Sequence, residues 1–373
     1  MVTNTPIALV PGKGLILQLR RGEFGLVLRQ TLFDGKYTDN DVALQEARTD
    51  SATSRLYAIA DDISLDIVKA YLDVIYQREV LMLSEENLQV HQRIQDQIRL
   101  RSDAGVGRRA DLDQINARVA LVEANLIASK VNVQDAITTY KRRTGVEPEE
   151  ILEPVPSVKE SLPAEVEEAI ELGKGENQVL RQAGFDIEAA NAANRAAGSN
   201  DYPFIYLEVT GNLNNDLDGT DGHYNDATAM LKMQYNLYNG GRDQAKKKQT
   251  AYQIQEASEI RNRTVRQIEE EIRLAWAALQ ATEMQLEQLQ KQVEFSIATR
   301  EAYSKQFNIG QRTLLDLLNT DNELYDAKVS LAGAKSDNLY AQYRILAAMG
   351  KLTNTMNIDL TALNDIPLKE SEE

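Results

Sequence analysis

The chain of 373 residues has no cysteine, only two histidines, and few prolines and glycines. Without cysteine there are no disulfides, and an oxidising compartment, where stray thiols are a hazard, is favoured. His91 and His223 stand alone, so we predict no metal site, no cofactor and no nucleophile–base pair, and we expect no enzyme activity. Because prolines and glycines are sparse outside a few clusters, long helices are expected.

A basic surface and a long apolar run are also missing. The formal charge of −16 argues against nucleic acid as a partner, since phosphate binding needs a basic face. No run of eighteen apolar residues exists, so no transmembrane helix is predicted, and residues 1–20 show no signal-peptide pattern. The stretch DLDGTDG at 216–222 lacks the ligand spacing and closing Glu of an EF-hand, so we predict a surface loop there.

What the chain does contain is an internal repeat. QTLFDGK at 30–36 resembles YNLYNGG at 235–241, and KAYL at 69–72 resembles LAWA at 274–277, each pair 205 residues apart. Gly145 and Gly350 show the same offset. The sequence therefore predicts a tandem duplication, with units near 22–145 and 227–350.

A second pair of similar stretches lies within these units, GVGRRADLDQINARV at 105–119 and NIGQRTLLDLLNTDN at 308–322. Matched by letter at an offset of 203, the pairs are Gly107 with Gly310, Arg109 with Arg312, Asp113 with Asp316, and Asn116 with Asn319.

Between its turn and this motif, each unit carries a long proline-free run. In the second unit apolar positions step by three and four, as in a coiled coil, so a helix roughly 100 Å long is expected at 1.5 Å per residue. Shorter seams follow the motifs. Each unit is thus predicted to be a long helical hairpin with the glycine motif at its tip. The seam positions are Val265, Ile268, Ile272, Ala275, Leu279, Thr282, Leu286, Leu289 and Val293, then Ile115, Val119, Val122 and Leu126, and Leu318, Tyr325, Val329 and Ala332.

Three alternating segments predict strands with one apolar face. Ten such residues, tilted, span a bilayer core, and the polar face suits a water-filled barrel. Two or three strands cannot close a barrel, and an open edge does not survive in lipid, so oligomerisation is required if they lie in a membrane. The apolar faces are Phe24, Leu26, Leu28 and Leu32, then Ile205, Leu207 and Val209, and Ala229, Leu231, Met233, Tyr235 and Leu237, with GNLNNDLDGTDGHYND as a polar loop between the last two strands.

These features together resemble the TolC family of outer membrane efflux and secretion channels, over nearly the whole length. The residues that carry the resemblance are FNIGQRTLLDLLNTDNELYDAKVSLAGAK at 307–335 and GVGRRADLDQINARVALVEANL at 105–126, supported by LFDGK and LYNGG. The strand patterns LRRGEFGLVLRQTLFDG and NDATAMLKMQYNLYNGG are most similar to the branch that serves type I secretion of large adhesins.

The resemblance implies a mainly α fold with a small β part, in which a homotrimer shares a twelve-stranded β-barrel in outer membrane lipid and an α-helical barrel in the periplasm. It also implies a periplasmic adaptor (membrane fusion protein) and an inner-membrane ABC transporter as partners. We expect the following segments: 1–34, loop and membrane strand; 35–145, first hairpin with its tip near 105–113; 146–176, Pro-rich equatorial connector; 177–201, leading helix; 202–239, membrane hairpin with its exterior loop; 240–350, second hairpin with its tip near 307–316; and 351–373, equatorial tail.

By matching position, the resemblance makes the tips a gate. Asp316 would line the constriction and Arg312 would tie neighbouring helices through Asp113, with Gly107, Gly310 and Asn319 completing the motif. Two residues depart from the family pattern: Phe307 stands where a Tyr is frequent, and Asn319 where a second acidic residue occurs. The plain alternative is that Asp113 and Asp316 are helix N-terminal charges and that the arginines face solvent. Arg99, Arg101 and Arg108 are expected to be such residues, or to form a basic rim that faces the adaptor.

The leading interpretation is therefore an exit duct of a tripartite export system, for type I secretion of a large adhesin. An outer membrane component of a drug or metal efflux pump is the alternative, and a soluble periplasmic coiled-coil adaptor is the second. Subtracting 205 places the counterparts of residues 178–211 mostly before Met1. We thus expect an N-terminally incomplete sequence, missing a signal peptide, a helix and most or all of one strand.

Overall fold

The computed structural model describes residues 22–215 and 222–360. The chain forms two compact units, which are described separately. One consists of Met1–Ser51 with Ala183–Ile260, and the other of Ala52–Gln182 with Arg261–Glu373. The expected loop at 1–21, most of the DLDGTDG stretch and the end of the expected tail lie outside the described residues.

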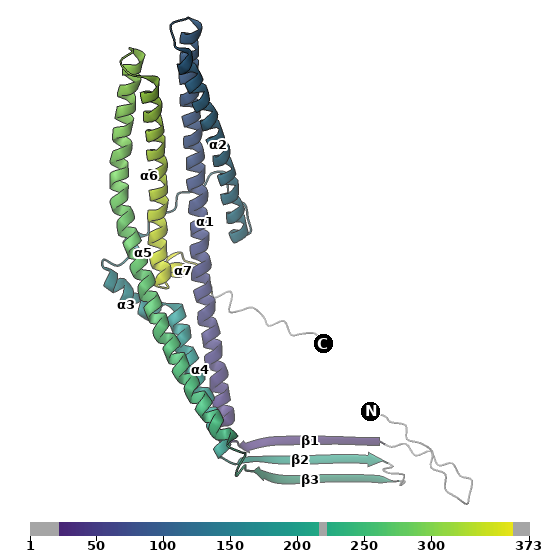
Figure 1. The fold of residues 1–373 in the computed structure, drawn as a ribbon. Coiled ribbons are helices and arrows are strands. Elements are labelled where there is room, and N and C mark those ends of the chain that lie inside the picture. The colour runs from purple at the N-terminus through teal and green to yellow at the C-terminus, as the bar shows by residue number, and fades with distance from the viewer. Residues whose placement is uncertain (1–21, 216–221, 361–373) are drawn as a thin grey trace, which may run out of the picture. The chain divides into compact units, whose positions relative to one another are not determined.

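Two long helical hairpins dominate the structure, as the sequence predicts (Figure 1). The first pairs α1 (Tyr37–Asp103) with α2 (Arg109–Thr144). The second pairs α5 (Arg242–Asn308) with α6 (Leu314–Ala348). Helices α1 and α5 both have 67 residues, or about 100 Å at 1.5 Å per residue. No helix among the described residues is long and apolar enough to cross a bilayer.

The duplication is visible in the helix boundaries themselves. Both ends of α5 lie 205 residues after the corresponding ends of α1. Left-handed glycines recur at the same interval: Gly35 and Gly240 with φ of 65° and 69°, Gly105 and Gly310 with 74° and 78°, and Gly145 and Gly350 with 80° and 72°. Only glycine adopts this conformation without strain, so the turns, and not only the helices, were duplicated.

This regularity corrects the matching of the two tip motifs. The structural counterpart of Gly310 is Gly105, because Gly107 has no left-handed φ. The first residues of α2 and α6, Arg109 and Leu314, also differ by 205. The letter match at 203 is therefore two residues out of register.

A Pro-rich connector and several short elements lie between the two hairpins in sequence. The short elements are η1 (Lys159–Ser161), α3 (Val166–Glu176), α4 (Gln178–Gly198) and η2 (Ser199–Asp201). A further short helix, α7 (Leu352–Thr355), follows α6. Side chains of α6 hold the Pro-rich connector through hydrogen bonds to its backbone. The Gln342 side chain accepts from Val158 N at 3.0 Å, and the Tyr343 hydroxyl donates to Pro156 O at 3.0 Å. The connector is therefore ordered against α6.

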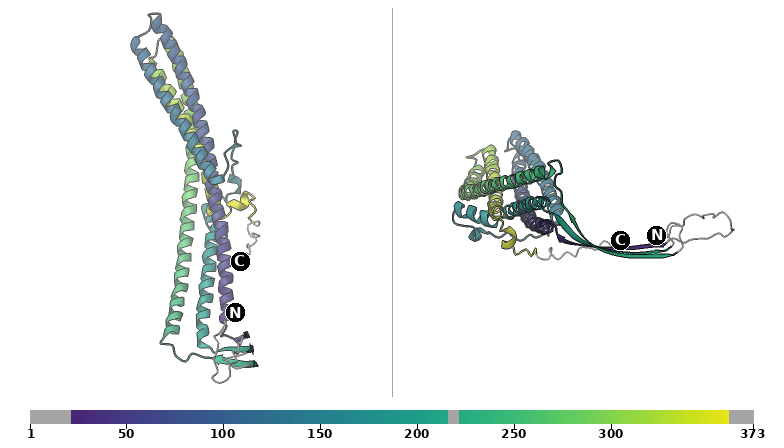
Figure 2. Two further views of the ribbon diagram at one scale, coloured as in Figure 1. Left: turned by 90° about the vertical axis from the view of Figure 1, so that its right-hand side faces the viewer. Right: turned by 90° about the horizontal axis from the view of Figure 1, so that it is seen from below.

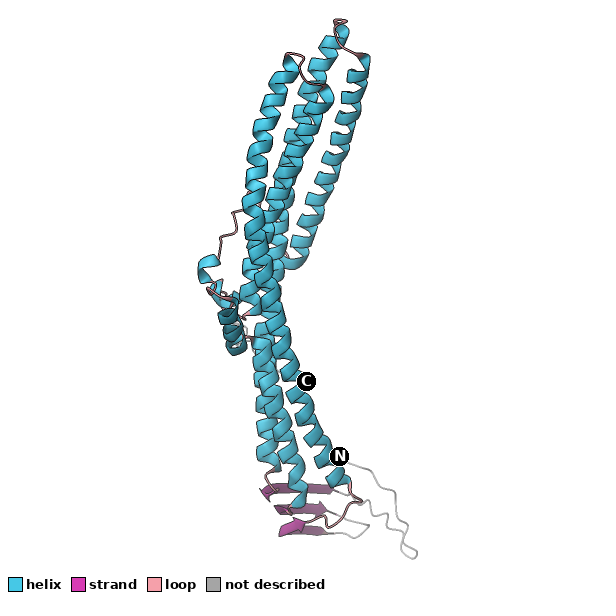
Figure 3. Ribbon diagram, turned by 60° about the vertical axis from the view of Figure 1, so that its left-hand side comes forward, coloured by secondary structure: helices cyan, strands magenta, loops and turns pink. Residues whose placement is uncertain are grey.

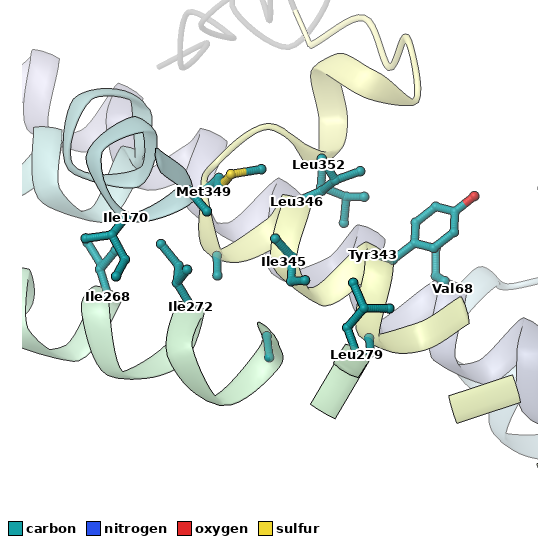
Figure 4. Close-up of a cluster of buried hydrophobic side chains, with 14 of the residues drawn as sticks. Val68, Ile170, Ile268, Ile272, Leu279, Tyr343, Ile345, Leu346, Met349 and Leu352 are labelled. Atoms are coloured by element: carbon teal, nitrogen blue, oxygen red, sulfur yellow. The ribbon is translucent and has the colours of Figure 1, made fainter. Parts of the chain in front are cut away.

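The largest core cluster joins α1, α3, α4, α5, α6 and α7 where the hairpins meet the connector (Figure 4). Ile272, Ile345 and Met349 are fully buried in it. The predicted seam positions Ile268, Ile272, Ala275 and Leu279 all belong to this cluster. Farther toward the tip, Leu286, Leu289 and Val293 are only half-buried. Within one chain, this part of the seam is therefore not fully covered by other helices.

Gly350 and Gly145 offer a matched test of packing at this junction. Both are left-handed, but a Cβ on Gly350 would lie 2.8 Å from Asn177 Cα and 3.0 Å from Glu176 O, whereas nothing lies within 4 Å at Gly145. We expect Gly145→Ala to cost about 1–2 kcal/mol for the left-handed backbone alone. Gly350→Ala carries the same cost plus a backbone clash, so its thermal unfolding midpoint should fall clearly further. Equal losses in the two variants would contradict this packing.

The sheet has three antiparallel strands in the order β1–β2–β3 (Figure 1), and Figures 2 and 3 show it from other sides. They are β1 (Gly22–Phe33), β2 (Phe204–Asn215) and β3 (His223–Gln234). All three have 12 residues, so much of the polar stretch predicted as a loop, 211–215 and 223–226, is strand. Strand β3 ends at Gln234, so Tyr235 and Leu237 lie beyond it.

A register shift between Thr31 and Phe33 changes one predicted position. Phe33, not Leu32, lies opposite Ile205 on the apolar face. Such an irregularity depends on the partner strand, and the alternation of a single strand cannot reveal it.

Candidate functional site

The sheet has one apolar face that continues across all three strands. Leu28 pairs with Val209, Leu207 with Leu231, and Ile205 with Met233. Leu28, Leu231 and Met233 are 63%, 69% and 70% exposed in the single chain. The predicted alternation is thus confirmed, and an apolar surface of this kind needs lipid or protein to cover it.

The opposite face of the sheet is polar and carries an ion cluster that the sequence analysis missed. The Glu208 carboxylate accepts from Arg29 Nη2 at 2.8 Å and also from Lys232 Nζ. The Arg29 guanidinium lies 4.8 Å from the centre of the Tyr206 ring. Glu208 is the only acidic residue of β2. In the alternation of the strands it lies on the same face as Arg29 and Lys232. A single acidic residue on the same face as two basic ones could have predicted the cluster.

Near the tips, a second core cluster joins the two hairpins of one protomer. It contains Ile94, Ile98, Ile115 and Val119 from the first hairpin with Phe307, Leu314, Leu317 and Leu318 from the second. Phe307, which departs from the family pattern, is 6% exposed in this cluster, and the Arg101 guanidinium lies 5.2 Å from its ring centre. Arg101 therefore contacts the other hairpin rather than simply facing solvent.

The two tips turn in the same way and differ in their caps. Gly105 N–H donates to Ser102 O and Gly310 N–H to Phe307 O, both at 3.0 Å, as in a glycine-ended helix. Thr313, the N-cap residue of α6, forms a capping box, whereas Arg108, the N-cap residue of α2, makes no side-chain cap hydrogen bond.

Asp316 is the partner of Thr313 in this box. Its Oδ2 accepts from Thr313 Oγ1 at 2.8 Å and from Thr313 N at 3.1 Å, and Asp316 N donates to Thr313 Oγ1 at 3.2 Å. These bonds, first of all the one from the hydroxyl, lower the pKa of Asp316. The plain alternative, a helix N-terminal charge, thus accounts for its geometry within one chain, and Asp111 is its structural counterpart in the first tip.

Thr313→Ala should therefore loosen the second tip and leave the first unchanged. Loss of a Thr cap costs about 1 kcal/mol. Because the folded pKa of Asp316 is lowered, its stabilising effect should be complete above about pH 4, the ordinary carboxyl range, and be lost as the pH falls through the folded value. Faster hydrogen exchange of the backbone amides of 314–318 in Thr313→Ala would measure the loosening. The control is Ala110→Gly in the uncapped first tip, which should leave the exchange of 314–318 unchanged. Unchanged exchange at neutral pH in the variant would refute the role of the box.

The other predicted tip residues are placed as follows. Arg312 Nε donates to Gln306 Oε1 at 3.0 Å, and its guanidinium lies 4.1 Å from the Tyr303 ring centre. Asp113 and Asn319 are exposed, and within the described part of the chain Asp113 has no hydrogen bond or ion pair. The structure does not join Arg312 to Asp113 within one protomer, so a tie between them would have to form between neighbours.

A buried ion pair below the second tip was also missed. Asp321 is 5% exposed, and its Oδ1 accepts from Arg300 Nε at 2.8 Å across α5 and α6. Asp321 lies between the seam positions Leu318 and Tyr325 at helical spacing, and that position could have predicted a buried charge with a partner. His91 is fully buried on α1, with Nδ1 2.9 Å from Asn87 O. In the described ranges no three His, Cys, Asp or Glu side chains gather as a metal site would require.

Comparison with known proteins agrees with this geometry. Residues 169–351 match the family described as outer membrane efflux protein. The chain is similar to the outer membrane efflux protein BepC of Brucella suis, with 28% identity over 333 residues, covering 89% of this chain and 73% of BepC. By these matches the chain is similar to TolC-like outer membrane efflux proteins.

Two further likenesses extend this result. The proteases secretion protein PrtF of Dickeya chrysanthemi is 24% identical over 332 residues, covering 83% of this chain and 69% of PrtF. The crystal structure of the outer membrane protein VceC of Vibrio cholerae has the same fold, with a TM-score of 0.77, 18% identity, and coverage of 94% of this chain and 85% of VceC. On these likenesses, the chain is an outer membrane efflux or secretion channel component, with its helical hairpins in the periplasm.

Proposed function

We propose that three copies of this chain form the exit duct of a type I secretion system that exports a large protein, working with a periplasmic adaptor and an inner-membrane ABC transporter. The observation that carries the proposal is the sheet. It has an exposed apolar face, a polar face with a charged cluster, and two outer strands, β1 and β3, each with one edge unpaired among the described residues. In hydrocarbon such edges must be paired, and closure into a barrel with other copies pairs them.

The hairpins support the same assembly. Apolar side chains along them stay exposed in the single chain, including Leu121, Ile127, Val131 and Met284. A ring of hairpins would cover such side chains from neighbouring copies. The tips would then meet around one opening, where we propose that Arg312 of one protomer pairs with Asp113 of another, and that Asp316, Asn319, Gly107 and Gly310 shape the constriction.

A secretion duct carries a protein, whereas an efflux channel carries small molecules. Similarity to the protease secretion protein PrtF favours secretion, and similarity to the efflux protein BepC favours efflux. In a strain that lacks the gene, the proposal expects a large polypeptide to disappear from the cell surface while sensitivity to small antibiotics changes little. A strong gain in antibiotic or metal sensitivity, with the surface proteins unchanged, would assign the chain to a small-molecule pump instead.

A further inference from the structure

The ion cluster on the polar face of the sheet has an unequal charge balance. Arg29 lies directly opposite Glu208 on the neighbouring strand, and Lys232 lies opposite Tyr206, two residues before Glu208. Both carboxylate oxygens of Glu208 are used: Oε2 accepts from Arg29 Nη2 at 2.8 Å and from Nε at 3.3 Å, and Oε1 accepts from Lys232. Two cations share one anion, which leaves one net positive charge per chain.

Exposure divides these charges unequally. The Glu208 side chain is 8% exposed, whereas the side chains of Arg29 and Lys232 are 58% and 38% exposed. A guanidinium has five N–H donors, and Arg29 uses only Nε and Nη2 on Glu208 within the described ranges. The Glu208 carboxylate is therefore buried, whereas Arg29 and Lys232 are accessible and Arg29 keeps N–H donors that Glu208 does not occupy.

The remaining charges of this face lie elsewhere along the strands. Glu23 and Asp226 have the same parity, but lie toward the strand ends that are not joined to the helices. The Asp226 carboxylate accepts from Asn212 Nδ2 at 3.1 Å. Among the described residues of this face, the two cations of the cluster therefore lie nearer the helices than the carboxylates of Glu23 and Asp226.

We propose that Arg29 and Lys232, held by Glu208, form a cationic ring that makes the helix-proximal half of the barrel lumen favour anions, whether small ions or the carboxylates of passing cargo. The proposal rests on the proposed function, because it takes the polar face as the lumen wall. Three copies give a ring of net charge +3, by the balance above. Rings of charged side chains set ion preference in pores, and low-dielectric walls strengthen their field.

The cluster could also serve only to align the strands, and ion selectivity separates the two roles. Glu208→Gln removes the hidden anion and doubles the net positive charge, so the reversal potential in a KCl gradient should shift toward chloride. The double variant Arg29→Gln with Lys232→Gln keeps the Glu208 carboxylate as the only charge of the cluster, so the reversal potential should shift toward that of potassium. The charge-preserving pair Arg29→Lys with Lys232→Arg is the matched control and should keep the original reversal potential.

A further variant tests the ring while leaving the cluster intact. Thr228→Glu adds a carboxylate on the same face, four residues from Lys232, and should cancel the preference for anions. All these shifts should shrink between about 0.1 M and about 1 M salt, because the screening length falls from about 10 Å to about 3 Å.

The outcomes separate this inference from the proposed function. If wild-type trimers do not conduct, the channel itself is refuted. If Thr228→Glu and the cluster variants conduct with the wild-type reversal potential, the ring plays no part in selectivity and the cluster only aligns the strands. Opposite shifts for Glu208→Gln and the double Gln variant would establish the ring.

Discussion

Leu231→Arg is expected to abolish assembly in the outer membrane. Leu231 lies opposite Leu207 on the apolar face and is 69% exposed. An arginine that faces lipid costs about 2–4 kcal/mol at the bilayer midplane and less near the interfaces, and a trimer carries three copies. Membrane fractionation and trimer content on mild-detergent gels would measure the loss.

The neighbouring residue supplies the control. Met230 lies on the polar face, directly opposite Glu208. Met230→Arg introduces the same charge one residue away, next to a carboxylate, so it should insert and form trimers. If Leu231→Arg inserts as well as Met230→Arg, the assignment of the apolar face to lipid is wrong.

Arg312→Glu is expected to open the proposed gate. A tie between Arg312 and Asp113 of a neighbour would be worth about 0.2–1 kcal/mol as a surface pair, and threefold symmetry multiplies it. Such a tie biases a closed state and remains weak enough for a docked partner to break, since a partner shifts the equilibrium only by its difference in affinity for the two states. Single-channel conductance should rise, and cells should become sensitive to large antibiotics.

Two further variants separate the tie from a general charge effect. Arg109→Glu makes the same charge change at the first tip, outside the tie, and should alter conductance much less. Asp113→Arg added to Arg312→Glu restores an opposite-charge pair and should partly restore closure. If Arg312→Glu leaves conductance unchanged in intact trimers, the motif serves only as the turn and cap seen within one chain.

The helices were predictable because their signals are local. The proline-free runs and the apolar steps at Ile268, Ile272 and Leu279 indicate long helices whatever packs on them, and the structure buries all three side chains. The strand faces were predictable for the same reason, since alternation alone assigns Leu28 and Leu231 to one side.

What could not be predicted depends on partners distant in the sequence. The register shift at Thr31 is determined by pairing with β2, and the Glu208 cluster forms only once three strands are aligned. At the tips, similar letters suggested that Gly107 matches Gly310, but the left-handed backbone belongs to Gly105. Residue identity therefore misaligned the two tips by two positions, whereas backbone conformation aligns them at the interval of 205 residues. The capping bonds of Asp316 were open to sequence reasoning, because Thr313 stands three residues before it.

If several copies of this chain build a membrane channel, the purified protein should be oligomeric and should conduct ions. The protein, expressed from its native gene and extracted from outer membranes in mild detergent, would be sized by light scattering and then added to planar lipid bilayers. We expect a trimer that produces discrete conductance steps. A monodisperse monomer that stays in solution without detergent and leaves the bilayer silent would contradict it.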